Sequence, residues 1–154
     1  MSGILGALAL SGLGTMLVGL HESEVLLAVA FVLVGASFIF VVGLNRVIWQ
    51  TKAAPEVLGR IFSLRVALGV GAQSVGVLIA GILAETLFEP LLQEDGALAE
   101  SVGAVIGVGP GRGMAFMFIL IGVALVLLTL GSVLLPSVRL LEDRVPDYDP
   151  EPTP

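Results

Sequence analysis

The sequence contains no cysteine and only one histidine, His21. Without cysteine the chain can form neither a disulfide nor a thiolate metal site, so a zinc centre of cysteine and histidine ligands is excluded. Charged residues are also scarce, at 13% of the chain, whereas a soluble domain ordinarily has about 25%. We therefore expect no metal and no cofactor, and the composition argues against a water-soluble fold.

Apolar residues dominate instead. They make up 56% of the chain, and the mean hydropathy is +1.06. The few charges cluster and leave several stretches of about 18 or more residues almost uncharged, which is enough to cross a hydrocarbon core about 30 Å thick. The sequence therefore predicts an all-α membrane protein. The net charge of −6 comes largely from acidic segments at 85–100 and 142–151, so nucleic-acid binding is not expected.

Four apolar stretches are long enough to be transmembrane helices. The chain starts without the positively charged segment that a secretory signal needs, so the first stretch is interpreted as a mature helix. A short polar link at 21–24 predicts that the first two helices form a tight antiparallel pair. The predicted spans lie within a four-helix segment at 1–145, and they are 4–20, 25–48, 61–86 and 114–135.

Lysine and arginine are placed unevenly about these spans. Short cytoplasmic loops retain such residues. The distribution predicts a multi-pass protein of the inner (plasma) membrane with both termini and the 46–65 loop in the cytoplasm. Six of the seven basic residues lie on the predicted cytoplasmic side, and they are Arg46, Lys52, Arg60, Arg65, Arg139 and Arg144.

The two remaining segments lie outside the predicted spans. Residues 87–113 form a long extracytoplasmic loop, and the mixed small and aliphatic residues at 97–106 favour a short helix at the membrane interface. Residues 146–154 are proline-rich and acidic, and they carry too little apolar area to fold. We expect this tail to be disordered in the cytoplasm.

Two of the predicted helices carry rows of small residues four apart. In lipid, such rows let helix backbones approach closely, so we expect both helices to pack against neighbours. The rows serve either static packing or, in a transporter, the sliding of helices during alternating access. The row on the third span is Ala72, Gly76, Ala80 and Ala84, and the row on the first is Gly3, Ala7, Ser11, Thr15 and Gly19.

Polar residues within the spans are few. They are Ser37 and Asn45 in the second span, and Gln73 and Ser74 near the middle of the third. Because polar groups are costly in lipid, these side chains either line a substrate path or form hydrogen bonds between helices. Glu85 lies at the outer end of the third span, where a solvated helix end is a better interpretation than a proton-coupling carboxylate.

The cytoplasmic loop between the second and third spans carries a helix-start pattern. Pro55 and Glu56 suit a first helical turn, because proline has no amide hydrogen to lose there and a carboxylate favours the positive end of the helix dipole. Arg60 lies four residues after Glu56, at a spacing that allows pairing, and Gly59 permits close approach of another backbone. The segment is either a charged anchor at the headgroups or a gating latch whose charges pair differently in two states.

Several segments together resemble the C-terminal part of major facilitator superfamily transporters, in the bacterial drug-export branch that includes macrolide-efflux-like proteins. The resemblance implies a twelve-helix fold with cytoplasmic termini, alternating access driven by a proton gradient, and an antiport of drugs or similar small molecules. The four spans would be the ninth to the twelfth helices. The segments are Asn45-Arg-Val-Ile-Trp-Gln-Thr-Lys, Pro55-Glu-x-x-Gly-Arg-Ile-Phe-Ser, Ala80-Gly-Ile-Leu-Ala-Glu, Phe88-Glu-Pro and Gly107-Val-Gly-Pro-Gly-Arg-Gly.

Two hypotheses follow. In the first, the chain is the C-terminal segment of an exporter, and its partners are the lipid bilayer, a small-molecule substrate and the missing helices of the same transporter. In the second, it is a free-standing four-helix protein that acts as an oligomer or accessory subunit. A small multidrug pump is disfavoured, because 4–20 contains no acidic residue. An enzyme is not expected, because no His or Asp lies within any span.

Overall fold

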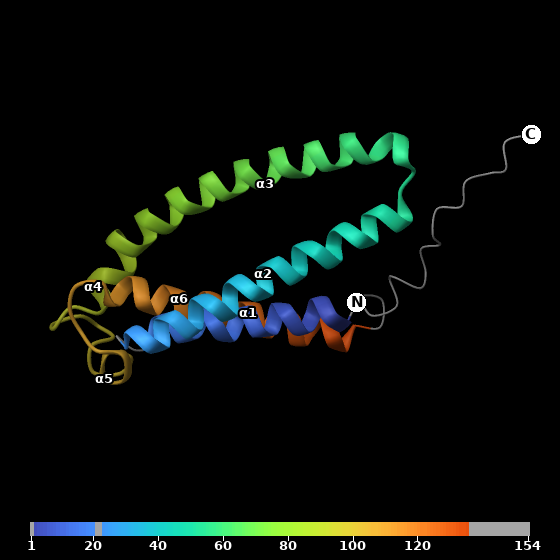
Figure 1. The fold of residues 1–154 in the computed structure, drawn as a ribbon. Coiled ribbons are helices and arrows are strands. Elements are labelled where there is room, and N and C mark those ends of the chain that lie inside the picture. Colours follow the sequence, from blue (N-terminus) through green and yellow to red (C-terminus); the bar gives the residue numbers. More distant parts are fainter. Residues whose placement is uncertain (1, 21–22, 136–154) are drawn as a thin grey trace, which may run out of the picture.

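In the computed structural model the described residues are 2–20 and 23–135, and all of their regular secondary structure is helical (Figure 1). Four helices are long and apolar enough to cross a membrane. The prediction of an all-α membrane protein is confirmed. The four helices run in alternating directions along the chain, and they are α1 (Ser2–Leu20), α2 (Glu24–Lys52), α3 (Pro55–Leu83) and α6 (Arg112–Leu134).

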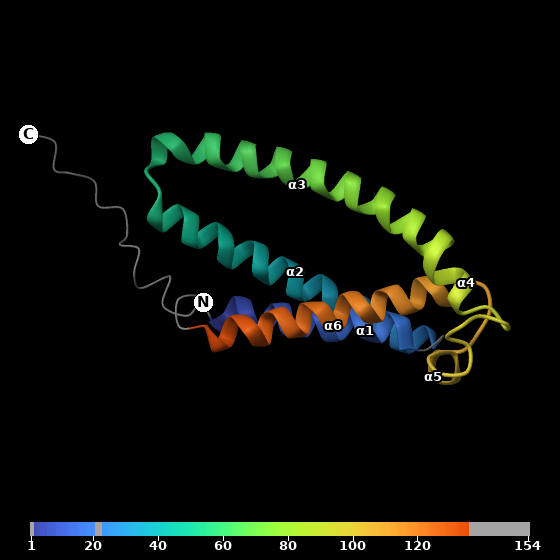
Figure 2. The ribbon, with the colours of Figure 1, turned by 180° about the vertical axis from the view of Figure 1, so that it is seen from behind.

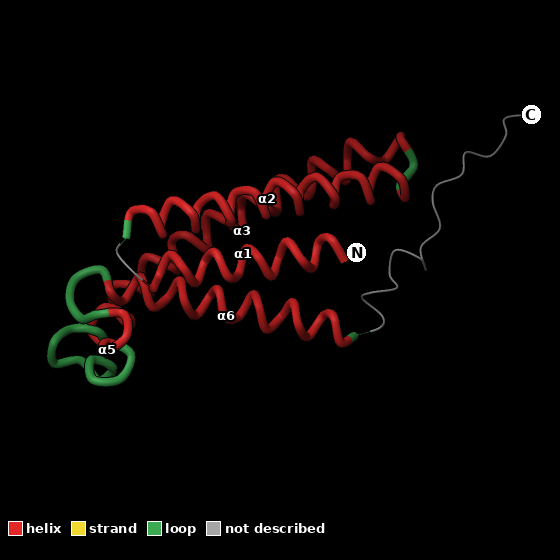
Figure 3. Tube along the Cα trace, turned by 60° about the horizontal axis from the view of Figure 1, so that its bottom comes forward, coloured by secondary structure: helices red, strands yellow, loops and turns green. Residues whose placement is uncertain are grey.

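Helix α1 lies between α2 and α6, and the three form the packed part of the molecule (Figure 3). Glycines make this packing close. A Cβ atom added at Gly122 of α6 would lie 2.6 Å from the carbonyl oxygen of Gly12 on α1, and one added at Gly14 would lie 2.9 Å from Val34 of α2. Small residues allow such backbone contact, which is the main source of helix association in lipid. Gly19 likewise meets the backbone of Ala115.

Helix α3 stands apart from these three helices. Every residue from 63 to 79 is exposed, so no side of the helix is buried along this stretch. Figures 1 and 2 show α3 running along one edge of the molecule and joining the rest only near its ends. The described chain therefore contains a three-helix bundle and one membrane-length helix without a packing partner in its middle.

The α2–α3 connection is a sharp elbow at Ala53 and Ala54. Both residues have extended backbones, with ψ angles of 142° and 138°, as expected before Pro55, whose ring disfavours the helical conformation of the preceding residue. The proline then starts α3 at its first turn. Helix α3 thus begins at Pro55, whereas the hydropathy pattern predicted a span starting at 61.

The other end of α3 changes helical type before it enters the long loop. A π-helical turn, η1 (Ala84–Phe88), is followed by α4 (Glu89–Leu91), and the Glu89 amide donates to the carbonyl of Ala84, five residues earlier. Pro90 explains this turn, because proline cannot donate an amide hydrogen and its ring clashes with the preceding helical turn. The loop therefore leaves α3 through a distorted last turn.

The long loop is compact, and Figure 3 shows it gathered at the end of the molecule near α5 (Gly103–Ile106). Leu92 is wholly buried beneath it, and its carbonyl accepts a hydrogen bond of 3.0 Å from the amide of Gly109. The helix predicted at 97–106 is present only as the four residues of α5, because 97–102 form turns. The predicted tail at 146–154, His21, Arg139 and Arg144 lie outside the described residues.

Candidate functional site

The four polar residues proposed for a substrate path are not brought together. Ser37 is buried on α2, on the same face as Ala30. The carbonyl of Ala30 lies 3.3 Å from the position of a Cβ atom at Gly14 of α1, so this face of α2 contacts α1. The hydroxyl of Ser37 has no hydrogen-bond partner among the described residues. Asn45 is half-buried further along α2.

Gln73 and Ser74 are exposed at the middle of α3. The hydroxyl of Ser74 donates to the carbonyl of Val70 at 2.9 Å, so its hydrogen is used within the helix. Arg65 marks the side of α3 that faces α2, because its guanidinium lies over Trp49. With about 100° per residue, Ser74 lies about 180° from Arg65 and Gln73 about 80° from it. Ser74 is therefore on the side of α3 turned away from α2.

The small-residue row of α3 begins on the opposite side. Ala72 and Gly76 lie within about 20° of Arg65 by the same geometry, so they face α2. Both are exposed, and a Cβ atom added at Gly76 would meet no atom within 4 Å. Ala80 is half-buried, and only Ala84 is buried, where η1 contacts α6. The four helices thus supply a packing partner for the end of this row and none for its middle.

The residues predicted to form a cytoplasmic gating loop lie at the start of α3. Pro55 occupies the first turn and Glu56 follows it, as the helix-start pattern predicted. Glu56 and Arg60 are both exposed, and no ion pair joins them in the described part of the chain. A Cβ atom at Gly59 would meet nothing within 4 Å. The surface that Glu56, Gly59 and Arg60 form at the start of α3 is therefore accessible to another protein segment.

Sequence analysis missed the contact that spans the elbow. The guanidinium carbon of Arg65 lies 5.1 Å from the centre of the Trp49 ring, within the range of a cation–π interaction. The side chain of Arg65 reaches back toward the elbow because helical side chains tilt toward the N-terminus of their helix. The sequence pattern that could have indicated this contact is a tryptophan before a short helix connection and an arginine after it.

A second missed feature is the cap of α6. The carboxylate of Glu89 accepts hydrogen bonds from the amides of Gly111 and Gly113, the latter at 3.0 Å. A carboxylate suits this position, because the first amides of a helix lack intrahelical acceptors and carry partial positive charge. Helix α6 has no acidic residue in its own first turn, which is the sequence signal for an anion supplied from elsewhere.

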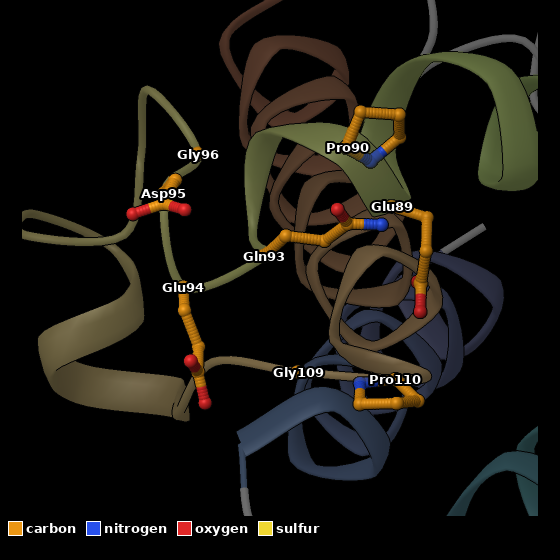
Figure 4. A pocket seen from close by; sticks show the side chains of 8 residues that line it. All are labelled: Glu89, Pro90, Gln93, Glu94, Asp95, Gly96, Gly109 and Pro110. Carbon is orange, nitrogen blue, oxygen red and sulfur yellow. The ribbon is translucent and has the colours of Figure 1, made fainter.

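The long loop between η1 and α6 also lines a hollow of about 610 Å³ that is open to solvent (Figure 4). Figure 4 shows the carboxylates of Glu94 and Asp95 lying apart from that of Glu89. No group of three or more His, Cys, Asp or Glu side chains among residues 2–20 and 23–135 is arranged to hold a metal ion. Glu85 is exposed in η1, at the loop end of α3. The lining residues are Glu89, Pro90, Gln93, Glu94, Asp95, Gly96, Gly109 and Pro110.

Comparison of the chain with models of known protein families, with curated proteins and with solved structures finds no match. The resemblance to the major facilitator superfamily therefore stays a prediction, which depends on the segments quoted above.

Proposed function

We propose that this chain is the C-terminal segment of a membrane transporter, and that α3 forms part of the wall of its solute path. The observation that supports this is the exposure of α3 on all sides from 63 to 79, with Gln73 and Ser74 at its centre. Polar groups at mid-membrane usually face another helix or a water-filled cavity. Further helices beside α3 would supply both the missing packing and the opposite wall of the path.

The class of transporter follows from the resemblance and remains part of the proposal. A major facilitator exporter would move drugs or similar small molecules across the inner membrane, driven by a proton gradient, with α1, α2, α3 and α6 as its last four helices. The face of α3 that carries Ser74 points away from α2, so it is free to meet the missing helices. No enzymatic role is proposed, because no nucleophile and base lie together within the described spans.

Cysteine accessibility tests the solute path, since the chain has no native cysteine. We expect Gln73→Cys and Ser74→Cys, expressed in native membranes, to react with a charged, water-soluble methanethiosulfonate. Val29→Cys serves as the matched control, because Val29 is an exposed apolar residue of another spanning helix, α2. The control should react at least about tenfold more slowly, because thiols in lipid stay protonated and the charged reagent does not enter hydrocarbon. Equal, slow labelling of all three would contradict a water-filled path.

The same variants separate the two hypotheses about what covers α3. Under mild oxidation, a Ser74→Cys disulfide between two copies would give a band of twice the 15.9 kDa chain mass. That band would favour a free-standing oligomer over a segment of a larger transporter.

The orientation of the chain in the membrane is tested with the reagent on one side of sealed vesicles, where Gly59→Cys should label from the cytoplasmic side and Gly109→Cys from the other. Labelling of both from one side would contradict the proposed topology.

We further propose that Glu56, Gly59 and Arg60 act as the cytoplasmic latch. Both charges are exposed and unpaired with each other in this structure, so they are available to a partner from the remaining helices. Arg60→Ala in the complete transporter should lower export severalfold while the protein stays in the membrane. Arg60→Lys, which keeps the charge, should retain most of the export. Unchanged export in the alanine variant would remove the latch from the proposal.

A further inference from the structure

On the elbow side, an arginine ends the uncharged run of each of the two helices α2 and α3. Residues 66–84 of α3 and its π-turn are uncharged, and so are residues 25–45 of α2. At 1.5 Å per residue these runs are about 28 Å and about 31 Å long, close to the roughly 30 Å of a hydrocarbon core. Arg65 and Arg46 directly bound the two runs at their elbow ends. If these runs cross the hydrocarbon core, both arginines are expected at the level of the lipid phosphates.

Trp49 marks the same level and orients Arg65. It lies one turn beyond Arg46 on α2, and its ring supports the guanidinium of Arg65 from α3. Tryptophan is enriched at this depth in membrane proteins. Arg46 and Lys52, three residues on either side of Trp49, are each about 60° from it around the helix. Arg46 and Lys52 thus flank Trp49 at the elbow end of the opening between α2 and α3.

Within residues 2–20 and 23–135, no carboxylate neutralises the charge of Arg65. No acceptor among the described residues takes a hydrogen bond from its guanidinium, and no ion pair involves it. Glu56 is the one carboxylate in the elbow, and it lies nine residues earlier, about half a turn around α3 from Arg65. The contact with Trp49 is a cation–π contact and uses no N–H group in a hydrogen bond to an oxygen, so the guanidinium N–H groups are available to the oxygens of a phosphate.

The surface of α2 and α3 on the side of the arginines away from the elbow is apolar. Phe38 and Val42 of α2 lie on the Trp49 face, with exposed fractions of 67% and 50%. Opposite them, the small residues Ala72 and Gly76 leave open space along α3. A ligand that fits both parts of this surface needs an anionic head at the level of Arg65 and a hydrocarbon chain beneath it. A free phosphate ion would satisfy only the upper part.

We propose that the opening between α2 and α3 binds one anionic phospholipid from the leaflet on the elbow side. Its phosphate accepts hydrogen bonds from Arg65 and is attracted by Arg46, and an acyl chain lies between Phe38 and Val42 on one side and Ala72 and Gly76 on the other. The lipid would also hold α2 and α3 at a fixed separation. This inference does not depend on the proposed transport, because the site is made entirely by the described residues.

Trp49 is the only tryptophan of the chain, so its fluorescence reports on this site alone. The chain is placed in phosphatidylcholine nanodiscs that contain either brominated phosphatidylglycerol or brominated phosphatidylcholine at equal mole fraction. Bromine on the acyl chain quenches a nearby tryptophan. We expect brominated phosphatidylglycerol to occupy the site at least about fivefold more strongly, since a basic residue near the surface contributes roughly this factor. Equal quenching by the two lipids would overturn the proposal.

Two variants distinguish a site from a diffuse positive field. Arg65→Gln should reduce the preference for phosphatidylglycerol by about fivefold, since it removes one basic residue. Arg60→Gln removes the same charge from another face of α3, about 140° away by helix geometry, and should leave the preference within about twofold. Arg46→Gln gives a second test on α2 and should also weaken the preference. A loss in Arg60→Gln as large as that in Arg65→Gln would overturn the assigned site.

Discussion

Gly122→Leu is expected to disrupt the packing of α6 on α1 and to cause a large loss of stability in the described bundle. A Cβ atom at Gly122 would lie 2.6 Å from the carbonyl oxygen of Gly12 and 2.7 Å from the amide nitrogen of Met16. These contacts are with backbone atoms, which cannot rotate away as a side chain can. Overpacking ordinarily costs about 1–3 kcal/mol, and a leucine against backbone should exceed that range.

Gly131→Leu is the matched control for this substitution. Gly131 lies on the same helix, and a Cβ atom there would meet nothing within 4 Å. Both variants exchange the same residues in a lipid environment, so the helix propensity and hydropathy changes are equal. The measurement is the free energy of unfolding in mixed micelles, followed by circular dichroism. Similar values for Gly122→Leu and Gly131→Leu would mean that α1 and α6 do not pack in the described way.

Glu89→Ala is expected to release the N-terminus of α6 from the end of α3. The substitution removes the acceptor for the amides of Gly111 and Gly113. Hydrogen bonds to charged groups contribute about 1.5–3 kcal/mol each, and the negative charge also favours the helix N-terminus. Amide hydrogen exchange of 109–116, measured by mass spectrometry, should therefore accelerate by at least about tenfold, since about 1.4 kcal/mol of local opening free energy corresponds to that factor.

The control is Glu94→Ala, which removes an exposed carboxylate from the same hollow (Figure 4). No hydrogen bond of Glu94 to the rest of the described chain is present, so exchange at 109–116 should not change. Glu89→Gln keeps an acceptor without the charge and should give an intermediate rate. If exchange at 109–116 stays slow in Glu89→Ala, the cap does not hold the loop to α6.

The spans and the fold class could be predicted from the sequence because they depend on local properties. Each membrane helix is defined by its own uncharged length, and Pro55 starts α3 wherever the rest of the chain lies. The partner of a given surface depends on residues distant in the sequence. The row at Ala72, Gly76 and Ala80 looks like a packing surface, yet the four helices bring no neighbour to its middle.

The candidate site residues differ in the same way, since some features follow from the local sequence and others depend on residues distant in the sequence. The helix start at Pro55 and Glu56 was accessible to prediction, since it follows from local helix-start chemistry. Ser37 and Ser74 have the same side chain in similar apolar surroundings in the sequence, but only Ser37 is buried against α1. The cap of α6 by Glu89 joins residues 22 and 24 positions apart, and no local pattern indicates such a pairing.

The sequence by itself determined that this chain enters a membrane as four helices, because the cost of burying charge in lipid acts on each segment separately. Only the tertiary structure decided which helices touch. Helix contact in lipid depends on matched small residues across two helices, as at Gly12 and Gly122, and on long-range groups such as Glu89 and the Trp49–Arg65 pair. The glycine contacts hold α1, α2 and α6 together, whereas Glu89 and the Trp49–Arg65 pair join α3 to them near its ends.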